Sequence, residues 1–386
     1  MSDIAEFLLA VGGLLLLGLV TDFLGKRTFL PRVTLLLIFG IIAGDEVLAV
    51  IPDSIHDRFE LITNMALLMV GFLLGGKLTV DSLRQDGRQL MWISLSAALG
   101  VVLIVTVILL LFGFPISIAL LLGCIASATA PAGTMATVLE AKSQSPFSKL
   151  LLAIVAIDDA WALILFSFGL AVTSILNGGD NGSLYLLEAG YETGGALLLG
   201  VVIGLPASYF TGRLNPGEPM LTEALGLVFI CGGLALWLEV SFLIAAMTMG
   251  AMITNLAKHH EYPFHEIENV EWPFMVVFFL LAGASLEISS LTGIGLLGGL
   301  YILARVIGKF AGAWLGATIS RADNKTRRWM GFALLPQAGV AIGMALLAAN
   351  EYPQYQQTIL SIIIGTTVIF EVIGPICTRI ALRRTE

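Results

Sequence analysis

The sequence predicts an all-α, multi-pass membrane protein of about 13 transmembrane helices. Of its 386 residues, 57% are apolar and only 12% are charged, whereas soluble domains carry about 25% charged residues. The apolar residues gather in runs long enough to cross a bilayer as helices. The formal net charge of −8 argues against a nucleic-acid partner. The three cysteines lie inside apolar runs and have no metal-binding spacing.

The apolar runs define the expected helices in chain order. The first run follows the acidic leader MSDIAE and has no cleavage pattern after it, so we expect a retained helix and not a signal peptide. The runs lie at about residues 4–21, 28–44, 59–76, 89–112, 115–140, 147–176, 184–211, 219–238, 241–257, 270–288, 291–319, 327–349 and 357–380.

The basic residues predict the orientation of these helices. Lysine and arginine collect after the odd-numbered runs and in the tail, whereas the even-numbered connections, such as NGGDNGS, are short or acidic. Cytoplasmic connections carry the excess of basic residues, so we expect the N-terminus outside and the C-terminus in the cytoplasm. The last run ends close to the C-terminus, and we expect a single transmembrane domain over 1–386 without a soluble regulatory domain.

Two of the runs have an interrupted pattern. The fifth contains CIASATAPAGTMATVLE (124–140) with Pro131, and the twelfth contains FALLPQAGVAIGMALL (332–347) with Pro336 and Gln337. Proline removes a backbone donor and disfavours helix at the residue before it. Each run alone is compatible with a simple proline kink. By the loop charges the two run in opposite directions, and such a pair is typical of an inverted-repeat transporter.

Two adjacent carboxylates interrupt the sixth run. Asp158 and Asp159 lie within AIVAIDDAWALILF (153–166), where ionisable groups are expensive and are functional candidates. Neighbouring side chains on a helix point about 100° apart, so both can border one cavity without sharing a face. Glu371 is a further acid inside the last run, for which a structural role is the simpler expectation and ion binding the alternative.

The eleventh run supplies basic residues at a similar depth. Arg305 and Lys309 are four residues apart, and therefore on one face of a helix. Lys309 is near the middle of its run and cannot easily reach water, whereas for Arg305 both snorkelling and a structural ion pair remain open. Small residues that permit close helix packing share this run: Gly308, Gly312 and Gly316.

Together these stretches resemble the cation:proton antiporter superfamily. The resemblance is closer to its second branch, which includes bacterial sodium/proton and potassium-efflux antiporters, and it covers essentially the whole chain. The residues that carry it occur in order as NMALLMVGFLLGGKL (64–78), SATAPAG (127–133), AIDDA (156–160), FFLLAGASLEI (278–288), RVIGKFAGAWLGA (305–317), LLPQAGVAIG (334–343) and FEVIGP (370–375).

The resemblance implies an antiporter fold in which the two broken helices cross at mid-membrane. They belong to a mobile core, expected from about 89–176 and 291–380, which moves against a dimerisation scaffold from about 1–76 and 184–257. A homodimer in the bacterial cytoplasmic (inner) membrane, with a role in pH homeostasis, is the implied assembly.

The resemblance also implies roles for individual residues. Asp159 is expected to bind the cation, and Asp158 to form a switchable pair with Lys309, with oxygens of Thr129 and Ser127 as further ligands. Many relatives have Thr-Asp at the first crossover, whereas here Ala130 follows Thr129, so the chain has no third carboxylate there. Possible supporting residues are Arg305, Glu371, Pro131, Pro336 and Gln337.

The expected activity is exchange of Na⁺ or Li⁺ for protons by elevator-type alternating access, with K⁺/H⁺ exchange as the alternative. A buried carboxylate beside a second one takes up a proton more readily than one in water, so proton and cation can compete for it. The paired aspartates imply electrogenic exchange in this superfamily. The exchanged ions are substrates, and no cofactor or enzymatic activity is expected.

Two other classes of protein also use buried carboxylates. A cation channel requires a repeated filter sequence, which is not found. An intramembrane aspartyl protease takes its two aspartates from different helices, one of them after Gly-x-Gly, and AIDDA has neither feature.

Overall fold

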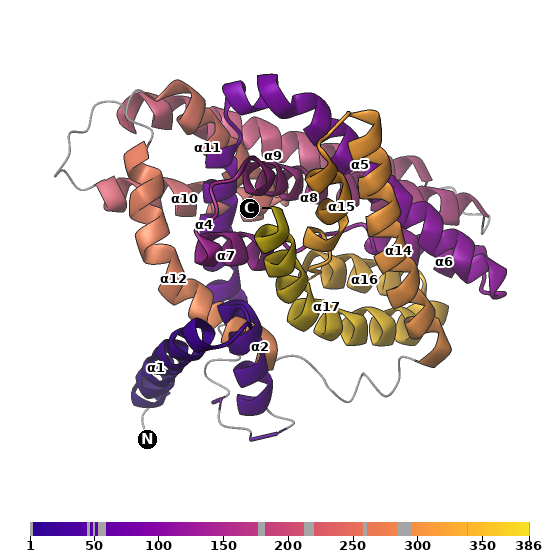
Figure 1. Ribbon diagram of the computed structural model, residues 1–386, viewed down its shortest axis with the longest axis horizontal. Helices are drawn as coiled ribbons and strands as arrows, with labels where there is room; N and C mark the ends of the chain where they lie inside the picture. Colours follow the sequence, from indigo (N-terminus) through magenta and orange to yellow (C-terminus); the bar gives the residue numbers. More distant parts are fainter. Residues whose placement is uncertain are drawn as a thin grey trace. The chain divides into compact units, whose positions relative to one another are not determined.

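The computed structural model describes residues 3–44, 47–48, 51–52, 59–176, 182–211, 220–257, 261–284, 295–337 and 339–385. All regular secondary structure in these ranges is helical (Figure 1). Seven of the described helices are long and apolar enough to cross a membrane. The predicted all-α membrane class is therefore confirmed, while the number of crossings stays a prediction.

Each predicted run coincides with one helix or with a broken pair of helices. The unbroken helices are α1 (Asp3–Arg27), α2 (Arg32–Ala43), α4 (Phe59–Lys77), α5 (Val80–Leu111), α8 (Pro146–Leu176), α9 (Gly182–Thr211), α10 (Met220–Trp237), α11 (Phe242–Leu256), α12 (Glu261–Ala284), α14 (Gly295–Ile319) and α17 (Gln356–Thr385). The broken pairs are α6 (Ile116–Ile125) with α7 (Pro131–Ala141), and α15 (Asn324–Ala333) with α16 (Gly339–Glu351). A 3₁₀ turn, η1 (Pro353–Tyr355), precedes α17.

Several helices extend beyond the apolar runs that predicted them. Helix α5 begins at Val80 and α12 at Glu261, each nine residues before its run, expected at 89 and 270. The added residues include Arg, Gln and Glu, which are good helix formers in water. Hydropathy marks the apolar part of a helix and not its polar extension. The end of the run at 285–288 lies outside the described residues.

The chain divides into two compact units. Unit 1 comprises Met1–Val80, Met135–Glu140 and Gly195–Leu286. Within it, α12 packs against α2 and α4, and α4 packs against α11 (Figure 1). Glycines bring these backbones together: a Cβ at Gly75 of α4 would collide with the carbonyl of Met247 on α11, and one at Gly283 of α12 with the carbonyl of Leu37 on α2.

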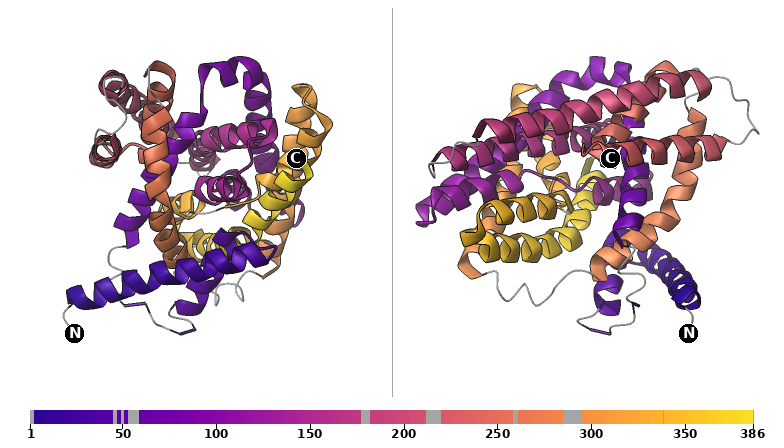
Figure 2. Two further views of the ribbon diagram at one scale, coloured as in Figure 1. Left: turned by 60° about the vertical axis from the view of Figure 1, so that its left-hand side comes forward. Right: turned by 180° about the vertical axis from the view of Figure 1, so that it is seen from behind.

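Unit 2 comprises Asp81–Thr134, Ala141–Gly194 and Glu287–Glu386. Within it α6 packs on α8, and α16 lies alongside α17 (Figure 2). The predicted glycine stripe of α14 packs on the backbone of α5: added Cβ atoms at Gly312 and Gly316 would collide with the carbonyls of Ser96 and Trp92. The predicted close packing of this stripe is thus confirmed. Both broken pairs begin in unit 2, and the candidate site lies there.

Candidate ion-binding site

The first predicted break interrupts the fifth run. Helix α6 ends at Ile125, and 126–130 are not helical. Helix α7 then begins at Pro131, a position that suits proline because the first helical N–H has no intrahelical partner. Ala130 precedes the proline and is therefore biased toward extended backbone. The short side chains of this segment leave its backbone carbonyls accessible to donors.

The second predicted break interrupts the twelfth run. Helix α15 ends at Ala333, and α16 begins at Gly339, with 334–337 outside any helix. Position 338 lies outside the described residues. The N–H of Ala130 in the first break donates to the carbonyl of Pro336 in the second, 2.9 Å away. The two interrupted helices therefore meet at their breaks, which agrees with the expectation that the two broken helices cross.

Arg305 of α14 donates hydrogen bonds to backbone carbonyls that the two breaks leave without helical partners. Its side chain is fully buried. Nε donates to the carbonyl of Ala126 at 3.1 Å, one terminal nitrogen to Ala128 at 2.9 Å and the other to Leu335 at 2.7 Å. The guanidinium also lies over the Phe370 ring, 4.3 Å from its centroid. Arg305 therefore does not snorkel; one side chain holds carbonyls of both breaks.

Gln337 makes a second polar link at the crossing. Its Nε2 donates to the carbonyl of Ile125 at 3.3 Å and lies 3.1 Å from the hydroxyl oxygen of Tyr301. Tyr301 is one turn before Arg305 on α14, and both Tyr301 and Gln337 are fully buried. The tyrosine was absent from the sequence prediction, although its spacing of four from Arg305 places it on the same helix face.

Lys309 lies at the centre of a compact buried cluster. Its Nζ donates to the carbonyl of Ser127 at 2.7 Å, to Oγ1 of Thr129 at 2.7 Å and to Oδ2 of Asp158 at 2.9 Å. The hydroxyl of Thr129 in turn donates to Oδ2 of Asp158. Lys309 and Asp158 form an ion pair with no solvent exposure. Buried charges are tolerated when they are paired and hydrogen-bonded, and these two are both.

Asp159 has a different environment from its neighbour. Its side chain is 2% exposed, yet neither carboxylate oxygen accepts a hydrogen bond from the described residues. Asp158 accepts its hydrogen bonds at Oδ2, and only its Oδ1 is buried without a hydrogen-bond partner among the described residues. Buried polar atoms without partners are rare and call for an explanation. The structure thus brings two adjacent acids into one interior and gives hydrogen-bond partners, among the described residues, only to Asp158.

The other predicted residues occupy supporting positions. Oγ of Ser127 donates to the carbonyl of Cys124 at 2.7 Å, so its hydroxyl hydrogen is used within its own turn. Pro336 lies against Gly374 of α17, where an added Cβ would contact it. Glu371 is on the same helix, and its Oε2 is buried without a hydrogen-bond partner among the described residues. The structure does not bring Glu371 into hydrogen-bonding contact with the Lys309 cluster.

Two broken helices that meet around buried, partly uncompensated charges define the class of protein. Irregular backbone at membrane depth is tolerated where protein groups satisfy it or where it lines a cavity. Helices interrupted at corresponding places of two halves form substrate sites in inverted-repeat transporters. The fold and site are therefore those of a secondary transporter.

Comparison with known proteins gives the family. The family model described as "Sodium/hydrogen exchanger, transmembrane" matches residues 11–384, and the chain belongs to this family. It is 25% identical over 358 residues to the ammonium/H⁺ antiporter subunit AmhT of Alkalihalophilus pseudofirmus, covering 89% of this chain and 87% of that protein.

Solved structures share the fold. The sodium proton antiporter MjNhaP1 of Methanocaldococcus jannaschii at pH 8 matches with a TM-score of 0.73 and 18% identity, covering 98% of this chain and 97% of that one. A second structure of MjNhaP1, from electron microscopy, matches with a TM-score of 0.74 and 19% identity, covering 97% and 93%. The chain is thus a multi-pass membrane protein of the cation:proton antiporter superfamily, and its substrates are cations and protons.

Proposed function

We propose that this antiporter exchanges Na⁺ or Li⁺ for protons, and that the two ions compete at Asp159. The observation that carries the proposal is the buried carboxylate of Asp159, whose two oxygens have no hydrogen-bond partner among the described residues. An ionised carboxylate in such a place is strongly disfavoured until a cation or a proton neutralises it. Either ion relieves this penalty, so each displaces the other.

The neighbouring charges support a division of roles. Lys309 and Thr129 hydrogen-bond to Oδ2 of Asp158, and Asp159 is the acid whose two oxygens have no hydrogen-bond partner among the described residues. The Asp158–Lys309 pair is a second site at which a proton can be gained or lost. Exchange of more than one proton for one cation moves net charge, so we propose electrogenic transport. Oxygens of Thr129 and Ser127 are the nearest proposed additional ligands.

We propose elevator-type alternating access for the movement. The core is assigned to about 89–176 and 291–380, and the scaffold to about 1–76 and 184–257, in a homodimer. In support, the buried side chains of Asp158, Asp159, Arg305 and Lys309 lie in unit 2, as does the hydrogen bond that joins the two breaks, whereas unit 1 contains most of the scaffold residues. The basic connections support an N-terminus outside and a C-terminus in the cytoplasm of a bacterial inner membrane.

The second candidate substrates are K⁺ and NH₄⁺, which are larger than Na⁺ and Li⁺. The relative AmhT is described as an ammonium/H⁺ antiporter subunit. Ammonium is a hydrogen-bond donor, and the oxygens of Asp159 have no donor among the described residues. Ammonium can therefore satisfy Asp159 by hydrogen bonds as well as by charge, whereas Na⁺ requires a tight shell of oxygens.

The experiment uses purified protein in proteoliposomes that hold a pH gradient. We expect Na⁺ and Li⁺ to dissipate the gradient, and Asp159→Asn to reduce this to the level of empty liposomes, because the amide can hold neither ion by charge. The ion-dependent rate is measured with a pH-sensitive dye for Na⁺, Li⁺, K⁺ and NH₄⁺. Subtracting the rate of Asp159→Asn liposomes removes passive ammonia flux.

The matched control is Asp158→Asn, which makes the same chemical change one residue away. We expect it to retain exchange and to lose the membrane potential that the native protein generates, measured with a voltage-sensitive dye. Retained exchange in Asp159→Asn would exclude Asp159 from the site. Dissipation by K⁺ or NH₄⁺ and not by Na⁺ or Li⁺ would replace the sodium assignment with the second candidate.

A further inference from the structure

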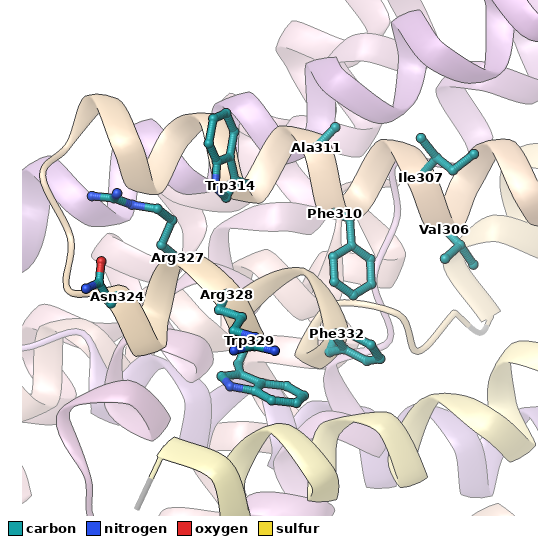
Figure 3. Close-up of a pocket in the computed structure, with 10 residues that line it drawn as sticks. All are labelled: Val306, Ile307, Phe310, Ala311, Trp314, Asn324, Arg327, Arg328, Trp329 and Phe332. Atoms are coloured by element: carbon teal, nitrogen blue, oxygen red, sulfur yellow. The ribbon is translucent and has the colours of Figure 1, made fainter.

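A groove with two chemically different ends lies between α14 and α15 in unit 2 (Figure 3). Its volume is about 930 Å³. Helix α14 contributes Val306, Phe310 and Trp314, and α15 contributes Arg327, Arg328 and Phe332. Arg327 and Trp314 lie toward the turn that joins the two helices, Arg328 lies beside Trp329 in the middle of α15, and Val306 and Phe332 lie toward the break after α15 (Figure 3). The groove therefore runs from a basic end to an apolar end.

The apolar end fits a hydrocarbon chain. Phe310 and Phe332 meet edge to face with centroids 4.2 Å apart. Figure 3 shows these two rings between the helices, with Val306 and Ile307 farther along α14. Ile307 and Trp314 remain 51% and 52% exposed. An open apolar surface of this kind is covered by lipid chains in a membrane protein, and the aromatic Trp314 suits the boundary between chain and headgroup.

The basic end has unused donors. Nε of Arg327 is buried and has no hydrogen-bond partner among the described residues, although a terminal nitrogen reaches the carbonyl of Ala322 at 3.4 Å. Arg328 is exposed and lies 5.7 Å over the Trp329 ring. The nearby carboxylate of Asp323 accepts hydrogen bonds from the backbone of α15 as its N-cap. Neither arginine forms an ion pair within the described part of the chain.

We propose that this groove binds an anionic phospholipid, with its phosphate at Arg327 and Arg328 and an acyl chain along Phe310 and Phe332. Basic pockets between membrane helices have the chemistry to hold anionic headgroups. A free phosphate ion would use only the basic end, and a zwitterionic lipid would bring a cationic amine to two arginines. The charge and the apolar floor together favour a lipid whose headgroup has net negative charge.

The groove is coupled by packing to the residues at the helix crossing. Phe310 follows Lys309 directly, and Gly331 of α15 packs against the backbone of Phe310 so closely that an added Cβ would collide with it. Arg305 on the same α14 holds the carbonyl of Leu335 just beyond α15. A lipid that contacts both helices therefore stabilises the contact between α14 and α15, independently of which cation is exchanged.

The test measures lipid binding by native mass spectrometry of the purified protein. The protein is offered equal amounts of dioleoyl-phosphatidylglycerol and dioleoyl-phosphatidylcholine. We expect phosphatidylglycerol to be retained preferentially. In the double variant R327Q/R328Q the ratio of bound phosphatidylglycerol to bound phosphatidylcholine should fall about 30-fold, because each arginine contributes one basic contact to the anionic headgroup. The matched control Arg384→Gln removes an exposed charge of α17 outside the groove and should keep the preference.

A second pair of variants leaves both arginines in place. Ala311 lines the groove, and Ala311→Trp should fill it and displace phosphatidylglycerol. Leu303→Trp adds an indole at an exposed position of α14 outside the lining residues and should not. Equal retention of the two lipids by the native protein, or a preference unchanged in both R327Q/R328Q and Ala311→Trp, would overturn the proposal. Competition by inorganic phosphate at equal concentration would also overturn it, because the site would then take the anion alone.

Discussion

The interiors of the two units are held together by different physical means. In unit 1, glycines such as Gly75 and Gly283 let neighbouring helices touch through their backbones. In unit 2, the same kind of packing joins α5 and α14, but the crossing of the broken helices depends on charged side chains. Among the described residues, the buried charged side chains belong to unit 2, apart from Glu271 of unit 1.

The difference follows from continuity of the helices. A continuous helix satisfies its own backbone groups, so its neighbours need only complementary shape, which glycine supplies. A broken helix exposes carbonyls at membrane depth, and only strong donors can compensate them. Arg305 and Lys309 donate to carbonyls of Ala126, Ser127, Ala128 and Leu335. The meeting of two broken helices in unit 2 thus depends on charged donors that a continuous helix does not need.

The largest expected effect comes from removing that framework. Arg305→Met keeps an unbranched side chain but leaves the carbonyls of both breaks without their donor. We expect a loss of about 3–5 kcal/mol of folding stability, because charged hydrogen-bond donors to buried groups are each worth about 1.5–3 kcal/mol. The measurement is the unfolding midpoint and expression yield of the detergent-purified protein.

The conservative variant Arg305→Lys separates charge from geometry. It keeps the positive charge but cannot reach three carbonyls with a planar fork, so we expect an intermediate loss of stability. A fully stable Arg305→Met protein would contradict the assignment of Arg305 as the donor that holds the two breaks.

The next effect concerns the glycine contacts of unit 1. Gly75→Ala adds one methyl group where the carbonyl of Met247 already lies, so α4 and α11 must move apart. We expect a loss of about 1–3 kcal/mol, typical of overpacking, with an unchanged order of preference among transported cations. The control Gly226→Ala makes the same change on α10, where an added Cβ has open space, and should not destabilise the protein, because alanine favours a helix over glycine. Equal stability of the two variants would contradict the close contact.

The sequence predicts the helices and breaks well because both depend on local properties. Run length predicts a membrane helix, and Pro131 and Pro336 mark the breaks because proline affects its own turn. Run length does not predict the polar first residues of α5 and α12, because it depends on apolar residues and a helix can continue through polar ones. The adjacent acids and Lys309 stand out because few charges occur inside apolar runs.

The role of Arg305 could not be predicted in this way. Its partners are backbone carbonyls, which every residue has, so no residue type indicates them. The i,i+4 spacing with Lys309 was visible, but snorkelling and ion pairing were the expected alternatives. Likewise, Asp158 has hydrogen-bond partners and Asp159 has none among the described residues because only Asp158 accepts from Lys309. Two adjacent acids in a sequence do not show which of them will do so.

The smallest expected effect sharpens the contrast between the two acids. Thr129→Val keeps the shape of the side chain but removes the hydroxyl that donates to Asp158 and accepts from Lys309. We expect a stability loss of only about 1–2 kcal/mol, because the ion pair between Lys309 and Asp158 stays in place. The pH dependence of exchange should shift, because the hydroxyl that joins Lys309 to Asp158 is no longer present. Thr129→Ser, which retains the hydroxyl, should keep the native pH profile. A profile that is the same in the valine and serine variants would show that the hydroxyl does not affect the pH dependence of exchange.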